Sequence, residues 1–160
     1  MPSARFEIEI LAPTETVFAF VSDFGNDPKW RSNVIAMKPL GRDSDLGGVW
    51  SRQIEVRKVP GRTIETTAVV TACEPGRIIS VQRANGPVRP KATYQLSSTE
   101  RGTRLTFELD ISLAGATWLA LPLVWLFLKL AIEPSLRTDF SNLKAVLERG
   151  THAPSRGSAN

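Results

Sequence analysis

Three polar residues, Arg52, Arg83 and Tyr94, fall in runs that are otherwise rich in valine, isoleucine and threonine. Extending the alternation of apolar and polar residues through these runs turns all three side chains towards the protein interior. A buried arginine is costly unless it is paired, so an inward guanidinium suits a carboxylate, phosphate or enolate oxygen of a ligand. Three alternatives stay open: a bulge turns Arg52 outward, Arg83 reaches solvent at a strand end, and the Tyr94 hydroxyl bonds a backbone carbonyl.

The same inward face carries small residues where a dense core would need large ones. Thr66, Ala68 and Ala92 lie near its middle. Either helix aromatics such as Trp118 and Trp125 fill the space above them, or a cavity remains. The other aromatic residues that we expect along such a cavity are Trp50 and Phe107 on the strands and Trp30, after Asp27-Pro28, at one end. A structural plug is the alternative role for Trp30.

Catalytic chemistry has little support in the sequence. His152 is the only histidine and lies near the C-terminus, Cys73 is the only cysteine, and no nucleophile has an evident base beside it. The acidic residues of the predicted strands fall on the predicted solvent face: Glu55, Glu65, Glu108 and Asp110. We therefore expect no metal site and no cofactor, and we favour a non-catalytic protein over an enzyme.

A sheet must position these residues. Turn signals at Pro60-Gly61, Pro75-Gly76, Asn85-Gly86 and Gly102 divide the middle of the chain into short runs rich in β-branched residues. These runs predict strands near 34–40, 49–58, 63–73, 77–84, 88–97 and 103–113, and the alternation of residues 5–10 predicts one more at the N-terminus.

Helices flank the predicted strands. The segment PTETVFAFVSDF, followed by NDPKW, predicts two short helices after the first strand. A long helix follows the last strand, from about Trp118 to Arg149, and Leu136, Phe140, Leu143 and Leu147 share one of its faces. The order predicts an α+β fold in which a curved antiparallel sheet of about seven strands wraps the long helix. Residues 1–149 are expected to form one domain and residues 150–160 a disordered tail.

Several segments resemble the START-like, or SRPBCC helix-grip, superfamily, in particular its polyketide cyclase/dehydrase branch. The segments are VFAFVSDFGNDPKWRSNV (17–34), IETTAVVTACEPGRIISVQ (64–82), YQLSSTERGTRLTFELDI (94–111) and LRTDFSNLKAVLE (136–148). The resemblance implies a sheet that wraps the last helix and a deep apolar pocket between them. It also implies a carrier or sensor of a hydrophobic molecule such as a lipid or polyketide, with a cyclase or dehydratase as the alternative.

The stretch TWLALPLVWLFLKLAI (117–132) is far more apolar than the rest of the chain. It is short for a membrane-spanning helix, which needs about 20 apolar residues. Three other interpretations are open: a buried start of the long helix, an exposed segment that contacts a membrane surface or a hydrophobic ligand, and a homodimer contact. Pro134 is expected to kink the helix about one turn beyond Lys129.

Composition limits the classes of function. The 160 residues carry a net charge of +4, with 42% hydrophobic and 22% charged residues. That charge suits weak attraction to anionic surfaces, and no nucleic-acid recognition motif accompanies it. The lone cysteine and the absence of a long apolar run in MPSARFEIEI favour a cytoplasmic protein, with membrane association as an addition.

Overall fold

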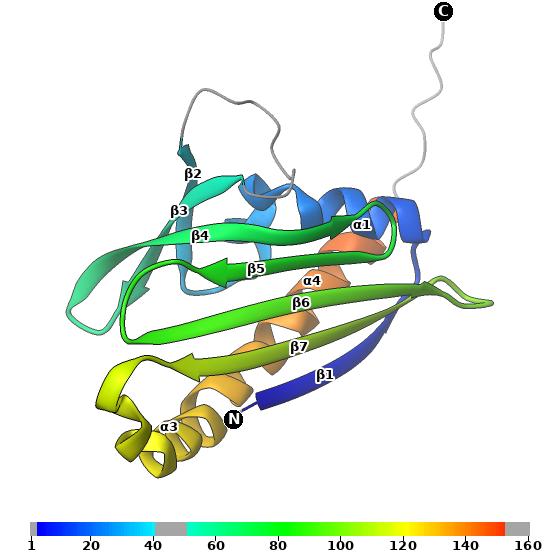
Figure 1. Cartoon of the computed structure of the whole chain (residues 1–160). Helices are drawn as coiled ribbons and strands as arrows, with labels where there is room; N and C mark the ends of the chain where they lie inside the picture. Colours follow the sequence, from blue (N-terminus) through cyan, green and yellow to red (C-terminus); the bar gives the residue numbers. More distant parts are fainter. Residues whose placement is uncertain (1–2, 41–50, 153–160) are drawn as a thin grey trace, which may run out of the picture.

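Seven antiparallel strands form one sheet in the order β1-β7-β6-β5-β4-β3-β2, and the helices gather on one side of it (Figure 1). The structure, a computed structural model, describes residues 3–40 and 51–152, without the side chains of 116–118 and 151–152. The strands are β1 (Ser3–Ile10), β2 (Val34–Leu40), β3 (Arg52–Val59), β4 (Arg62–Glu74), β5 (Ile78–Arg83), β6 (Val88–Ser98) and β7 (Thr103–Leu113). The helices are α1 (Thr14–Ser22), η1 (Phe24–Asn26), α2 (Asp27–Trp30), η2 (Gly115–Ala120), α3 (Leu121–Phe127), η3 (Leu128–Ile132) and α4 (Glu133–His152).

The predicted element order and the α+β fold are confirmed. Every predicted strand is present, with ends that differ by a few residues at most. Glycine is required in these turns for two reasons. Gly61 and Gly76 follow proline and have φ angles of 79° and 75°, which residues with a Cβ rarely adopt. Gly102 is needed for space instead, because a Cβ there would lie 2.2 Å from the Ile10 carbonyl oxygen. The β6–β7 turn therefore packs directly on the end of β1.

Helix α4 lies across the concave face of the sheet (Figure 1) and contributes Phe140, Leu143 and Leu147 to the core. Phe140 is at the centre, with ring centroids of Phe107 at 4.9 Å, Trp30 at 5.6 Å and Tyr94 at 6.5 Å. Leu143 and Leu147 continue the same stripe and are buried. The face predicted from the spacing of these leucines and Phe140 is therefore the face that packs on the sheet.

The long C-terminal helix is not uniform. A π-helical segment, η3, separates α3 from α4, and Pro134 is the second residue of α4. Proline has no N–H to donate to the carbonyl four residues earlier, so the regular α-helical pattern is interrupted where the kink was predicted. The helix also extends to His152, so residues 150–152 continue the domain, while residues 153–160 of the predicted tail lie outside the described part of the chain.

The apolar stretch that contains α3 is mostly exposed, so the interpretation of it as a buried start of the helix does not hold. Among the described side chains of residues 119–132, only Leu128 is fully buried, with Val124 and Ile132 half-buried. The large residues that remain exposed are Leu119, Leu121, Leu123, Trp125, Leu126, Phe127 and Leu130. Within residues 3–40 and 51–152, no helix has the length and hydropathy to cross a membrane.

Candidate functional site

The middle of the concave face brings together residues that the sequence predicted to be neighbours. Ala68 on β4 lies opposite Gln53 on β3 and opposite Arg83 on β5, so the three form one row across the sheet. Residues directly opposite each other on antiparallel strands point to the same face. Arg83 and Ala68 therefore face inward together, and in the next row Thr66 does the same opposite Glu55.

This face is filled at one end and open at the other. Tyr94 and Phe107 are buried beneath Phe140, and their own ring centroids are 5.0 Å apart. Thr66, Ala68 and Ala92 are instead only half-buried. Small side chains therefore leave part of the sheet surface accessible beside the aromatic core, in the region where the sequence predicted missing volume.

A network of four charged side chains lies next to the open part. Arg31 Nη1 donates to Asp27 Oδ2 and to Glu55 Oε2, both at 3.0 Å. Arg57 Nε donates to Glu55 Oε1 at 2.8 Å. The side chains of all four are at most 23% exposed, and two cations balance two anions. Glu55 was predicted to face solvent, and that prediction is wrong.

The surroundings of the network move the pKa of its members in different directions. Burial raises the pKa of Asp27 to about 6, although Arg31 acts in the opposite sense. Burial also disfavours the charged form of Glu55, but Arg31 and Arg57 outweigh it and hold its pKa below the usual range. Burial favours the neutral form of Arg31, while Glu55 and Asp27 keep its pKa raised overall. Arg31 and Glu55 are thus firmly ionised, while Asp27 can hold a proton near pH 6.

Arg83 differs from these arginines because it has no partner among the described residues. In the described part of the chain its guanidinium makes no hydrogen bond and no ion pair, although it is half-buried. Burial and the nearby Arg57 and Arg31 lower its pKa, with only Glu55 acting against them. An inward cation without a counter-ion is costly, and an acceptor from outside the protein would relieve that cost.

Three more donors on the buried side of the sheet are unpaired in the described structure. Gln53 is 4% exposed and stands in the same row as Arg83, and its amide Nε2 has no partner within the described residues. The same holds for Nε1 of Trp30, which is 3% exposed. Tyr94, whose pKa burial raises, also makes no hydrogen bond through its hydroxyl in the described structure. Arg83, Gln53 Nε2 and the Tyr94 hydroxyl can each donate a hydrogen bond, so the arrangement is suited to a ligand that brings oxygen atoms.

The remaining predicted site residues have other positions. Arg52 lies opposite Val69 and is exposed, so its predicted inward orientation is wrong. It borders a recess of about 280 Å³ that Gln82, Arg83 and Arg89 also line. Trp125 is 53% exposed and does not fill the interior. Trp30 packs on Phe140 and closes the aromatic end. Trp50 and the side chain of Trp118 lie outside what the structure describes.

Sequence reasoning missed the inward positions of Gln53, Glu55 and Arg57. The signal was the two-residue turn at Pro60-Gly61, which makes Val59 and Arg62 partners and so places Arg57 opposite Ile64. Because Ile64 points inward, Arg57 must point inward too. Counting back from that turn, instead of forward from Trp50, would have given the register of β3.

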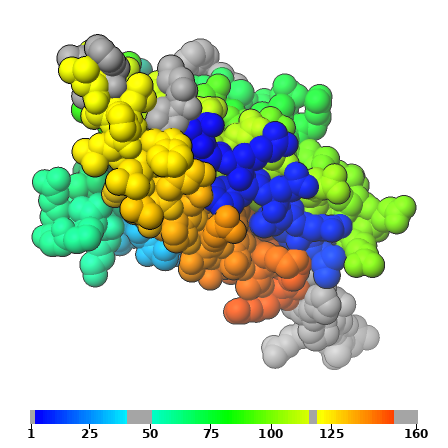
Figure 2. All heavy atoms as spheres, turned by 90° about the horizontal axis from the view of Figure 1, so that it is seen from below, coloured from blue at the N-terminus to red at the C-terminus, as the bar shows by residue number. Residues whose placement is uncertain are grey.

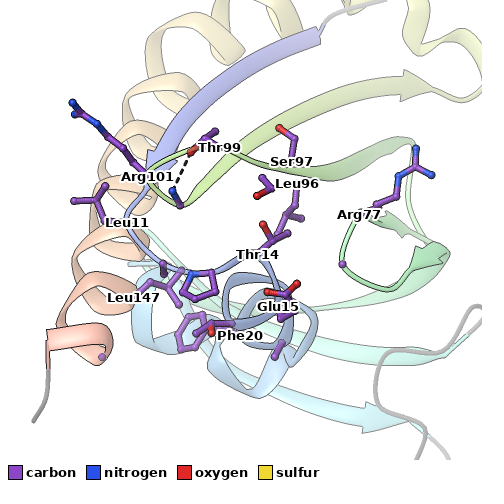
Figure 3. Close-up of a pocket in the computed structure, with 18 of the residues that line it drawn as sticks. Leu11, Thr14, Glu15, Phe20, Arg77, Leu96, Ser97, Thr99, Arg101 and Leu147 are labelled. Carbon is purple, nitrogen blue, oxygen red and sulfur yellow. Dashed lines mark hydrogen bonds between the residues drawn. The ribbon is translucent and has the colours of Figure 1, made fainter. Parts of the chain in front are cut away.

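A larger groove lies at the other end of the molecule (Figure 3). It has a volume of about 1620 Å³ and runs between α1, the β4–β5 and β6–β7 turns and the end of α4. Leu96 and Leu147 lie on its wall, and the Thr99 hydroxyl accepts from the Gly102 N–H at 3.1 Å. The Arg77 and Arg101 side chains extend away from it, and Glu15 is exposed. Its volume exceeds the 300–1,000 Å³ usual for ligand pockets, and it is an open surface groove.

Metal binding has no support at either place. Across residues 3–40 and 51–152, no three side chains of the types His, Cys, Asp and Glu are grouped so that they could hold a metal ion.

Comparison with known proteins identifies the family. Residues 1–148 match the family model described as polyketide cyclase / dehydrase and lipid transport, and the chain belongs to this family. The predicted resemblance is therefore confirmed over nearly the whole chain. No curated protein matches the chain by sequence.

Solved structures agree on the fold. The Zhui aromatase/cyclase from Streptomyces sp. R1128 has a TM-score of 0.77 at 13% identity, covering 96% of this chain and 97% of that one. A START superfamily protein from Mycobacterium smegmatis gives 0.71 at 20% identity, covering 92% and 97%. The di-domain aromatase/cyclase StfQ from the steffimycin biosynthetic pathway gives 0.73 at 13% identity, covering 94% of this chain but 52% of its own length. At these identities the likeness shows the helix-grip fold, and function must be argued from the site.

Proposed function

We propose that this protein is a non-catalytic carrier or sensor of a hydrophobic small molecule whose head group carries oxygen acceptors. The observation that carries the proposal is Arg83, an inward guanidinium without a partner in residues 3–40 and 51–152, next to the half-buried Ala68 and Ala92. An apolar tail would cover the small residues, and a carboxylate or phosphate would pair with Arg83. Family membership supports the same class of ligand.

The paired arginines explain why Arg83 is the recognition group. Arg31 and Arg57 are both committed to Glu55, and the network that they form is neutral as a whole. A ligand anion would gain little from them without breaking those pairs. The positive charges of Arg57 and Arg31 lower the pKa of Arg83. Of the three guanidinium groups, that of Arg83 is the only one without an ion pair in the described structure. Gln53 Nε2, in the same row, is placed to donate to a second oxygen.

A cyclase or dehydratase is the second candidate. The Tyr94 hydroxyl makes no hydrogen bond in the described residues, and it shares the inward face with Ala92 through Ile79 and Val81 on β5. With Arg83 it would orient or polarise a ketone-rich chain. Folding a reactive chain inside a shaped surface needs no nucleophile. Turnover of an aromatic polyketide mimic that is lost in both Arg83→Met and Tyr94→Phe would favour this candidate over the carrier.

The test uses a fluorescent fatty acid, 11-(dansylamino)undecanoic acid, as the probe. Wild-type protein is expected to bind it, and Arg83→Met to bind it about tenfold or more weakly, because a charge-assisted hydrogen bond contributes about 1.5–3 kcal/mol. Arg52→Met is the matched control: Arg52 borders the same recess as Arg83 but lies opposite Val69 on the outer face, so its loss should leave the affinity unchanged. Native mass spectrometry of the purified protein would show any molecule that it carries.

Two results would count against the proposal. One is an affinity that Arg83→Met and Arg52→Met change equally. The other is equal binding of the dansyl acid and its methyl ester by the wild type, because Arg83 should distinguish them by charge. We expect the protein to act in the cytoplasm, where the single half-buried Cys73 would stay reduced.

A further inference from the structure

Helix α3 exposes more apolar surface than any packing role requires. Leu123 and Leu130 are 69% and 70% exposed, Phe127 is 59% and Trp125 is 53%. Large apolar groups scattered singly on a surface need no explanation, but here they are adjacent on one short helix and its π-helical continuation. In Figure 2 this yellow segment stands at one corner of the molecule, beside the N-terminal strand.

The exposed residues go most of the way around the helix. At 100° per residue, Leu121, Trp125, Leu126, Leu123 and Phe127 span an arc of about 240°. Only the sector of Val124 and Leu128 turns to the protein core. A flat protein surface can cover one side of such a helix, whereas a fluid apolar medium covers every exposed direction at once.

The turns at this end of the molecule are basic. The β3–β4 hairpin and the β5–β6 turn lie at the same end as α3 (Figure 1). Residues 57–62 and 83–91 contain six lysines and arginines and no acidic residue. Lys58, Arg62 and Arg89 among them are exposed. Nearby acids are few and placed opposite cations: Glu133 pairs with Lys129, and Asp110 lies across from Lys91.

The opposite end shows that this charge is not general. In the β4–β5 turn Glu74 pairs with Arg77 at 3.3 Å, and the β6–β7 turn carries Glu100 beside Arg101. Each of these turns is neutral. The positive turns therefore coincide with the exposed apolar helix, and an anionic surface with an apolar layer beneath it would complement both.

We propose that the protein docks on anionic lipid bilayers through α3, which lies in the interface while Lys58, Arg62 and Arg89 face the lipid head groups. The helix has seven residues, about 10 Å of length, which suits burial within one leaflet. A second copy of the chain fits less well as the occupant. A symmetric contact through α3 would bring two sets of basic turns together, and it would leave part of the 240° arc uncovered.

The test is co-sedimentation with vesicles of palmitoyl-oleoyl phosphatidylcholine containing 30 mol% of the phosphatidylserine analogue. We expect binding at low salt that falls as salt increases. The double substitution Leu123→Ser with Phe127→Ser should lower the partition coefficient about tenfold or more for each residue. Replacing Lys58 and Arg62 by glutamine should lower it about fivefold for each charge.

A matched control distinguishes specific docking through α3 from non-specific adsorption of exposed apolar residues to vesicles. Ile35 and Leu40 on β2 are 51% and 46% exposed, and the pair Ile35→Ser with Leu40→Ser should bind vesicles like the wild type. The emission of Trp125 should shift to shorter wavelength on binding, and Trp125→Phe should remove most of that shift. These surface substitutions leave the buried core unchanged, so circular dichroism should be the same for every variant.

Three results would overturn the proposal. The first is no binding of the wild type to the anionic vesicles at low salt. The second is equal loss of binding in the α3 pair and the β2 pair. The third is a dimer, seen by sedimentation velocity without lipid, that the α3 substitutions convert to a monomer; α3 would then be a contact between copies. None of these results depends on whether Arg83 binds a ligand, so this proposal and the proposed carrier function can fail separately.

Discussion

The two halves of the C-terminal helical run have opposite surroundings, and the more apolar half, α3, is the one that is exposed. In α4, Phe140, Leu143 and Leu147 are at most 5% exposed, whereas Leu123 and Phe127 in α3 are 69% and 59% exposed. The π-helical segment η3 and Pro134 lie between the halves. The half that repeats apolar residues at three and four is the half that packs, and the half that is apolar all round is not covered by its own chain. Hydrophobicity alone does not distinguish core from binding surface.

The largest expected effect on stability compares one phenylalanine of α4 with one of α3. Phe140→Ala should lower the free energy of unfolding by about 3–5 kcal/mol, because it empties the centre of the aromatic cluster. Phe127→Ala should change it by less than about 0.5 kcal/mol, because the ring is mostly in solvent. Urea denaturation followed by far-ultraviolet circular dichroism measures both. Equal losses would mean that α3 packs as tightly as α4.

A second comparison concerns ion pairs on the sheet. Glu55 joins Arg31 and Arg57 and is buried, so Glu55→Gln should cost about 3 kcal/mol by leaving two guanidinium groups without their carboxylate. Glu65 pairs with Lys38 at 3.6 Å in the open, with side chains that are 58% and 59% exposed. Glu65→Gln should therefore cost less than about 0.5 kcal/mol. Chemical denaturation of both variants tests whether the buried network stabilises the folded protein. A cost for Glu55→Gln no larger than that for Glu65→Gln would refute it.

The third prediction uses pH to separate Asp27 from Glu55 in the same network. Burial raises the pKa of Asp27 from 3.8 to about 6, so between these values the folded state binds more protons than the unfolded state. The free energy of unfolding should therefore decrease, by about 2 kcal/mol, as the pH rises from about 4.5 to 6.5. Glu55, with a lowered pKa, acts in the opposite direction and only below about pH 4.5.

The variant Asp27→Asn has no group to titrate in that range, so its stability should be flat where the wild type falls. Urea midpoints at half-unit pH steps give both curves. A wild-type stability that rises through this pH range would contradict the prediction and show that Arg31 holds Asp27 ionised.

The last comparison of stability concerns Arg83. Arg83→Met removes a half-buried charge that has no partner in the described structure, so the free energy of unfolding should stay within about 1 kcal/mol of the wild type or increase. Arg57→Met, on the next strand but one, should destabilise by several times as much because it breaks the bond to Glu55. Thermal unfolding of the two variants side by side makes the comparison. A large loss for Arg83→Met would mean that a structural partner exists.

Local sequence signals were enough for the strands and for the packed half of the last helix. Alternation and turn residues located β1 and β7 and the Pro-Gly turns, and the four residues of the α4 stripe lie against the sheet as predicted. Those features depend on short-range periodicity and on backbone conformations that only a few residues adopt.

The errors came from features that depend on contacts over longer range. The predicted register of β3 was wrong by one residue. It therefore placed Arg52 on the inner face instead of Gln53, and it placed Glu55 on the solvent face. Bulges add to this difficulty, since the pairing of β4 with β5 shifts between Val70 and Ala72. The exposure of α3 could not be read from its composition, because a run of leucines looks the same in a core and at a docking surface.

The most direct test of the carrier site is nuclear magnetic resonance of alanine methyl groups during a titration with dodecanoate. The account predicts that the methyl resonances of Ala68 and Ala92 on the concave face shift with saturation, and that Ala19 in the groove beside α1 does not. Shifts at Ala19 with none at Ala68 and Ala92 would place the ligand at the wrong end of the molecule and contradict the account.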